Sequence, residues 1–106
     1  MNNQLQELFQ AYKNRPNKGC KHNSSAYINY AEAVQTINPK LDITEFKTGN
    51  KVHYMTGTII GSFMYNAKVI TVDDSTITIQ PCGTSWKNKY LKFENNSNTY
   101  IAKGWL

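Results

Sequence analysis

The chain has 106 residues, and twelve Lys or Arg against seven Asp or Glu give it a formal net charge of +5 at pH 7. This length suits one ordinary domain, which buries roughly 60 to 70% of the surface that its unfolded chain would expose. Seven Tyr, four Phe and two Trp argue against a disordered chain, since such chains are poor in aromatic residues. We expect a single domain over residues 1–106, with a helical part over 1–39 and a β-barrel part over 40–106.

Membrane and secretory classes are disfavoured. No apolar run approaches the roughly 20 residues that cross a bilayer, and the first residues lack the basic and then apolar order of a signal peptide. We therefore expect no membrane partner and a cytoplasmic location. Two reduced thiols are favoured over a disulfide, because Cys20 and Cys82 lie far apart in a chain with no secretory signal.

Thirteen Asn, eleven Lys and nine Ile against a single Arg are typical of AT-rich coding. Phages and low-GC bacteria fit this composition, and a phage protein would act in the host cytoplasm. The same bias weakens the inference from lysine content to function.

The positive charge gathers toward the two ends of the sequence. Residues 1–22 carry four bases and one acid, residues 23–50 two bases and three acids, and residues 51–106 six bases and three acids. The three segments therefore have net charges of +3, −1 and +3. This distribution favours an anionic partner.

Two helices are expected in the first part. Over Asn3 to Lys13 the apolar residues follow helical spacing, with Asn2 or Asn3 as N-cap; they are Leu5, Leu8, Phe9 and Tyr12. A second helix should begin at the Asn23-Ser24-Ser25 cluster and stop at Asn38-Pro39, because the residue before proline is pushed out of the α region. Its spaced residues are Tyr27, Tyr30, Ala31, Val34 and Ile37.

From Leu41 onward, β-branched residues and turn residues predict short strands. The strand candidates are LDITEF, KVHYMTG, TIIGSF, NAKVITV, TITIQ, KYLKFE and TYIAKGWL, with turns at Thr48-Gly49-Asn50, at Asp73-Asp74-Ser75 and at residues 95–98. The clearest hairpin joins NAKVITV to TITIQ. We expect an α+β fold in which two short N-terminal helices precede a small antiparallel SH3-like or OB-like β-barrel.

The stretch from about residue 47 to residue 80 resembles small SH3-like barrels of the KOW and Tudor type in its rhythm of turns and strands. Such barrels occur in nucleic-acid and transcription proteins and also as protein-interaction modules, so the resemblance does not decide between the two. A helix-turn-helix with a β-wing is an alternative. The second helix would make a poor recognition helix, because Glu32 is its only charged residue.

Two segments are candidates for nucleic-acid binding. The connector between the helices can follow a phosphate backbone through its basic residues, which are Lys13, Arg15, Lys18 and Lys21. The segment SWKNKYLKF mixes cations with aromatic rings that can stack on bases, at Trp86, Lys87, Lys89, Tyr90 and Lys92. In an extended strand, one face would carry Trp86, Asn88, Tyr90 and Lys92, and the other Lys87, Lys89, Leu91 and Phe93. The simpler interpretation is a solvated linker and a strand whose Leu91 and Phe93 belong to the core.

Metal binding and catalysis are disfavoured. Cys20 and His22 form one Cys-x-His pair, whereas zinc usually needs two close pairs of ligands. His53 and Cys82 are distant in sequence, and both histidines are expected at the surface. The GTIIG stretch around Gly57 and Gly61 lacks the lysine and following helix of a phosphate loop. We expect no cofactor, no metal and no enzymatic activity.

Two functions remain. The favoured one is a small basic accessory protein that binds DNA or RNA largely through phosphates, with a phage source in keeping with the composition. Lysine outnumbers arginine, the base-reading residue, so we expect little sequence specificity. The alternative is a protein-binding module that modulates a host or viral enzyme, as an inhibitor or anti-defence protein, because Tyr and Trp are enriched at interface hot spots. The oligomeric state, and the choice between DNA and RNA, stay open.

Overall fold

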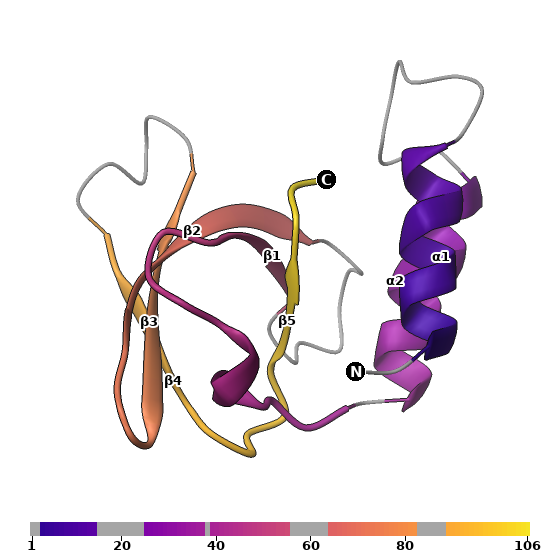
Figure 1. Ribbon diagram of the computed structural model, residues 1–106. Helices are drawn as coiled ribbons and strands as arrows, with labels where there is room; N and C mark the ends of the chain where they lie inside the picture. The colour runs from indigo at the N-terminus through magenta and orange to yellow at the C-terminus, as the bar shows by residue number, and fades with distance from the viewer. Residues whose placement is uncertain (1–2, 15–24, 38, 56–63, 83–88) are drawn as a thin grey trace.

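A computed structural model describes residues 3–14, 25–37, 39–55, 64–82 and 89–106. In these residues the chain forms two α-helices followed by a five-stranded antiparallel sheet, which curls into a half-barrel (Figure 1). The expected α+β class with a barrel-like sheet is confirmed. Among the described residues, no helix is both long enough and apolar enough to cross a membrane.

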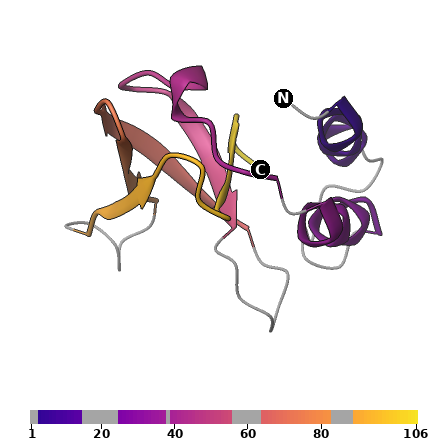
Figure 2. The ribbon, with the colours of Figure 1, turned by 90° about the horizontal axis from the view of Figure 1, so that it is seen from below.

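The helices have the predicted extents. Helix α1 (Asn3–Lys13) buries Leu5 and Tyr12, and helix α2 (Ser25–Ile37) ends just before Asn38-Pro39. The buried side chains of α2 are four of the five that helical spacing selected, namely Tyr27, Tyr30, Ala31 and Val34. The two helices lie side by side at one flank of the sheet (Figure 2). The expected capping residues Asn2, Asn23 and Ser24, and the stop residue Asn38, lie outside the described residues.

Five predicted strands are present in the sheet. They are β1 (Lys51–Met55), β2 (Tyr65–Val72), β3 (Thr76–Pro81), β4 (Leu91–Glu94) and β5 (Tyr100–Lys103), in the spatial order β4-β3-β2-β1-β5. Strands β1 to β4 form a meander of antiparallel neighbours, and β5 returns beside β1. The TIIGSF segment lies outside the described residues.

The expected strand over LDITEF is wrong. A 3₁₀ helix, η2 (Ile43–Glu45), occupies this segment. Asp42 is its N-cap, and the Asp42 carboxylate accepts hydrogen bonds from the backbone N–H and the hydroxyl of Thr44. Such a local bond between side chain and backbone competes with the strand conformation. The alternating apolar residues Leu41, Ile43 and Phe46 are still buried, in the core of the half-barrel.

The two turns next to these elements use residues that tolerate a positive φ angle. Gly49 has φ 89° in the turn before β1, and Asn96 has φ 66° in the turn between β4 and β5. Asparagine and glycine are the residues that adopt this left-handed conformation at least cost. Both predicted turns are therefore confirmed.

The core has two parts, one on each face of the sheet. The inner face packs against the segment that contains η2, through Leu41, Ile43, Phe46, Val52, Tyr54, Ala67, Val69, Ile77, Ile79 and Ile101. Among the described residues, the outer face packs against the two helices near β1, near β5 and just before β2. This second cluster contains Leu5, Tyr12, Tyr27, Tyr30, Ala31, Val34, Met55 and Met64. Among the described residues, this cluster contains no residue of β2, β3 or β4 themselves.

Candidate nucleic-acid interface

Cross-strand pairing aligns polar side chains on the outer face of the sheet. Lys51 of β1 is the direct partner of Lys68 of β2, and Lys68 is the direct partner of Gln80 of β3. The neighbours of these residues along the strands, such as Val52, Val69 and Ile79, belong to the inner core. Because side chains alternate along a strand, Lys51, Lys68 and Gln80 lie together on the other face.

Aromatic residues lie at both ends of this line. At one end, the ammonium groups of Lys51 and Lys68 lie over the ring of Trp105. Nζ of Lys51 is 4.6 Å from the ring centroid, and Nζ of Lys68 is 5.9 Å from it. At the other end, Tyr90 directly precedes β4, where Leu91 is the partner of Ile79. Continuing this register by one residue places Tyr90 opposite Gln80. The Tyr90 side chain is 58% exposed. We call this set, Trp105, Lys51, Lys68, Gln80 and Tyr90, the outer-face row.

The Trp105 ring is held in place by hydrogen bonds around it. Its Nε1–H donates to the carbonyl oxygen of Ala67 at 2.9 Å, and the next backbone N–H, of Leu106, donates to Oδ1 of Asn66 at 2.8 Å. Both acceptors belong to β2, so the segment after β5 crosses over β1 to reach it. The ring is therefore a fixed support beneath the two lysines.

Lys51 and Lys68 are two like charges at directly opposed positions, which destabilise a sheet when nothing compensates them. Among the residues that the structure describes, neither lysine forms an ion pair with a carboxylate, and the Trp105 ring is the partner of both. A cation over an aromatic face gains about 0.5 to 1 kcal/mol at an exposed site, so compensation is partial. An anion bound between the ammonium groups would complete it.

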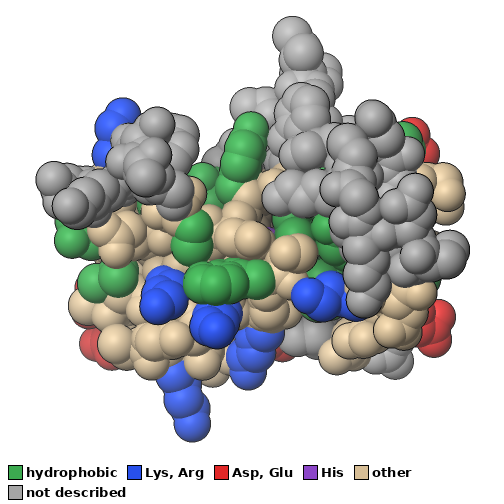
Figure 3. Space-filling view, turned by 90° about the horizontal axis from the view of Figure 1, so that it is seen from above, with side chains coloured by type: hydrophobic (Ala, Val, Ile, Leu, Met, Phe, Trp, Pro, Cys, Tyr) green, Lys and Arg blue, Asp and Glu red, His purple; other side chains and the backbone are tan. Residues whose placement is uncertain are grey.

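Lys13 brings a third cation to the Trp105 end of the row. Its Nζ donates to the carbonyl oxygen of Trp105 at 2.8 Å and lies 5.9 Å from the centre of the Phe9 ring. Lysine side chains gather beside an exposed hydrophobic side chain in the middle of the face seen in Figure 3, and acidic side chains lie toward its margins. The end of α1 is thus adjacent to the row.

The structure describes only some of the residues that the sequence selected for nucleic-acid binding. Lys13 is described above, Lys89 and Tyr90 are exposed before β4, and Lys92 is exposed in β4, where it pairs with Thr78. Leu91 and Phe93 pack against the inner core, so the predicted division of this strand into two faces is confirmed for β4. The remaining candidates, Arg15, Lys18, Lys21, Trp86 and Lys87, lie outside the described residues.

His53 is fully buried, which contradicts the expectation of a surface histidine. It lies on the outer face of β1, where the helix pair covers the sheet. Its Nδ1 is 2.8 Å from the carbonyl oxygen of Gly104, which can only accept, so Nδ1 carries the proton. Its Nε2 therefore accepts from the Tyr30 hydroxyl at 2.7 Å, and the Tyr30 oxygen accepts from the Tyr100 hydroxyl at 2.5 Å.

Burial determines the protonation states of His53, Tyr30 and Tyr100, the three side chains that these hydrogen bonds join. Loss of solvent lowers the pKa of His53 to about 4, a change that the hydrogen bond to Gly104 opposes and the charge of Lys13 reinforces. Burial also raises the pKa of Tyr30 and of Tyr100 above the usual value for tyrosine. All three side chains are neutral at pH 7, so the network joins helix to sheet without charge.

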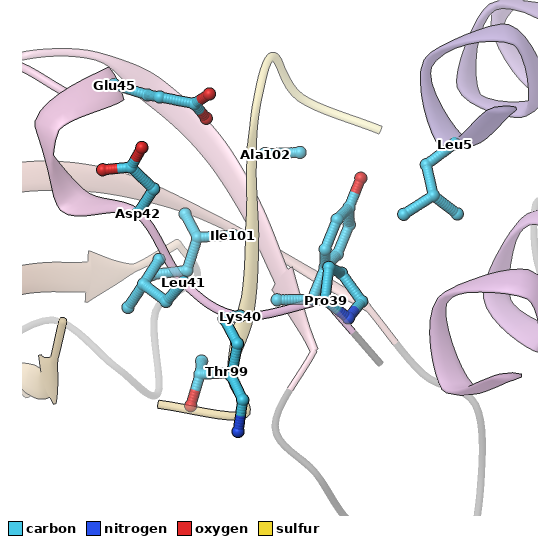
Figure 4. Close-up of a pocket in the computed structure, with 10 residues that line it drawn as sticks. Leu5, Pro39, Lys40, Leu41, Asp42, Glu45, Thr99, Ile101 and Ala102 are labelled. Carbon is cyan, nitrogen blue, oxygen red and sulfur yellow. The ribbon is translucent and has the colours of Figure 1, made fainter. Parts of the chain in front are cut away.

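A pocket of about 240 Å³ lies between α1, the segment before η2 and β5 (Figure 4). Leu5 borders it from the helix, while Asp42 and Glu45 lie at its other end and Lys40 at its margin (Figure 4). The Asp42 carboxylate is engaged by Thr44, whose hydrogen bonds lower the pKa of Asp42. Lys40 Nζ donates to Oδ1 of Asn98 at 2.6 Å. Asp42 and Lys40 therefore serve the local fold.

Metal-ligand types are scattered in the described part of the chain. No group of three or more His, Cys, Asp or Glu residues there could hold a metal ion. Cys82 is exposed and carries a free thiol, while Cys20 and His22 lie outside the described residues.

Searches against known proteins returned nothing that bears on these sites: no family model, curated protein or solved structure matches this chain.

Proposed function

We propose that this protein binds DNA or RNA through its phosphates, with the outer-face row as the contact surface. The observation that carries the proposal is the direct pairing of Lys51 with Lys68 over the Trp105 ring, with no carboxylate partner among the described residues. Two adjacent ammonium groups on a fixed support form a site for an anion. The net charge of +5 adds long-range attraction for a polyanion.

The candidates outside the described residues extend this proposal in sequence. Arg15, Lys18 and Lys21 follow Lys13, which contacts the Trp105 end of the row. Trp86 and Lys87 precede Lys89 and Tyr90, at the other end. We propose that both segments add contacts to the same nucleic acid, and that Lys89 and Lys92 contribute charge beside Tyr90.

The test is binding of a fluorescently labelled oligonucleotide, measured by anisotropy over a series of salt concentrations. Each phosphate contact contributes about 0.7 to 0.9 to the slope of log affinity against log salt. Replacing Lys51 and Lys68 by Gln should therefore reduce that slope by about 1.4 to 1.8. Replacing Lys13, Arg15, Lys18 and Lys21 together by Ser should reduce it by up to about 3 to 4 if all four contact phosphate.

Lys40→Gln is the control for each single lysine replacement, because it removes one positive charge near the pocket of Figure 4. This variant lowers the net charge, and its slope of log affinity against log salt should stay within error of the wild-type slope. Absence of binding at low salt, or equal slopes for the control and for the Lys51 and Lys68 variants, would contradict the proposal.

A protein partner is the second candidate, as a module that modulates a host or viral enzyme. The high tyrosine content supports this candidate less in the folded protein, because four of the tyrosines are buried and cannot contact a partner. They are Tyr12, Tyr27, Tyr30 and Tyr54. What still favours it is the exposure of Tyr65 and Tyr90, at 50% and 58%. Affinity purification that recovers nucleic acid or nothing would count against it.

The barrel type and the source also belong to the proposal. A meander whose fifth strand returns beside the first favours the SH3-like alternative over the Greek-key order of OB-like barrels. The AT-rich composition favours a phage gene acting in the host cytoplasm.

A further inference from the structure

The shape of the outer-face row bears on which form of nucleic acid it accepts. The sheet curls around the inner core, so its outer face is convex. From β1 to β4 the row crosses three strand spacings of about 4.8 Å, or about 14 Å in all. A ligand must follow this curve to reach both the lysines and Tyr90.

A duplex is poorly suited to such a surface. It is itself a convex rod, with a persistence length of about 150 base pairs, and it does not bend over 14 Å. Two convex bodies touch over a short length, so a duplex on Lys51 and Lys68 would leave Tyr90 without contact. A flexible single strand can follow the curve across all four strands.

The two aromatic ends of the row have different roles. The ammonium groups of Lys51 and Lys68 lie over the Trp105 ring, which is fixed by its bond to Ala67, so a base could stack there only by displacing a cation. Tyr90 is 58% exposed, and a base can stack on its ring without displacing a cation. Stacking on one ring accepts every base.

We propose that the row binds a single strand that runs across β1 to β4, with phosphates at Lys51 and Lys68 and a base stacked on Tyr90. This inference rests on the proposed function and specifies its substrate class. DNA and RNA share this chemistry, so both belong in the test.

The experiment compares labelled oligo(dT), oligo(rU) and a hairpin duplex, each of about ten nucleotides or base pairs. The wild-type protein should bind at least one single strand about tenfold more tightly than the duplex at the same salt concentration. Tyr90→Ala should weaken single-strand binding about tenfold and leave duplex binding and the salt slope unchanged. Tyr90→Phe should retain wild-type affinity.

Tyr65→Ala is the matched control, because Tyr65 is also half exposed but lies in β2 with the inner-face residues Ala67 and Val69. It should bind single strands like wild type. Equal or tighter duplex binding that still depends on Lys51 and Lys68 would overturn this inference and leave the proposed function intact. Equal losses from Tyr90→Ala and Tyr65→Ala would overturn it as well, and absence of binding to all three oligonucleotides would overturn both proposals.

Discussion

Tyr30 of α2 and His53 of β1 are joined by a hydrogen bond of 2.7 Å between the tyrosine hydroxyl and Nε2 of the imidazole. Both side chains are completely buried. The bond connects the helical part to the β part. It also gives the second ring nitrogen of His53 a hydrogen-bond partner, on a sheet face that the helices exclude from solvent.

Removing the Tyr30 hydroxyl should therefore destabilise the whole protein. Tyr30→Phe leaves His53 Nε2 without its donor and the Tyr100 hydroxyl without its acceptor. A buried polar group that loses its partner costs about 1 to 3 kcal/mol. Urea denaturation should show a loss of this size, whereas Tyr65→Phe, at an exposed ring, should stay within about 0.5 kcal/mol of wild type. Similar small losses for both variants would contradict the role given to this bond.

Stability should also fall as the pH drops below the usual histidine range. The folded pKa of His53 is about 4 and the unfolded value is 6.5, so the unfolded chain binds more protons between these values. Stability is full above pH 6.5 and is lost progressively as the pH falls toward 4. Between pH 7 and pH 5 the expected loss in the free energy of unfolding is roughly 2 kcal/mol.

Two variants isolate the contribution of His53 to this pH dependence. His53→Asn should remove most of the difference between pH 7 and pH 5, even though the variant is less stable at both. His22→Asn, at the second histidine of the chain, should keep it. If the difference in the free energy of unfolding between pH 7 and pH 5 persists in His53→Asn, other groups cause the pH dependence and this prediction is wrong.

Gly104 should be harder to replace than Gly49. Both residues have a positive φ angle, 99° and 89°, which penalises any side chain. A Cβ at Gly104 would also lie 3.3 Å from Cε2 of Phe9, whereas a Cβ at Gly49 would have no atom within 4 Å. Gly49→Ala should cost about 1 kcal/mol in thermal or chemical denaturation, and Gly104→Ala measurably more. Equal costs would show that Phe9 moves freely.

Much of the fold could be predicted because its signals are local. Helical spacing and the stop at Asn38-Pro39 marked both helices, and short polar turns marked the β2–β3 hairpin. The segment after Leu41 was mistaken for a strand because its alternation is real, but the Asp42 cap closes a 3₁₀ turn instead. Local capping by one side chain outweighs alternation over so few residues.

The candidate interface could not be predicted from local patterns. Lys51, Lys68 and Trp105 are far apart in sequence and meet only through the register of β1 with β2 and the crossing of the last segment. His53 was expected at the surface because it is distant in sequence from other metal-ligand types, and contacts with Phe9 and Tyr30 of the helices explain its burial. Register and long-range packing depend on the whole chain. Lys13, Tyr90 and Lys92 were accessible to sequence reasoning because exposed charge and aromatic content are local properties.

The most direct test of the central claim is an NMR titration of the ¹⁵N-labelled protein with unlabelled oligo(dT) or oligo(rU). The outer-face row predicts that the backbone amides of Lys51, Lys68, Gln80 and Tyr90 and the indole N–H of Trp105 shift together, saturate together and return as salt is added. Amides of α2 and of η2 should stay in place. Shifts confined to those elements, or no shifts at low salt, would contradict the claim that this sheet face binds nucleic acid.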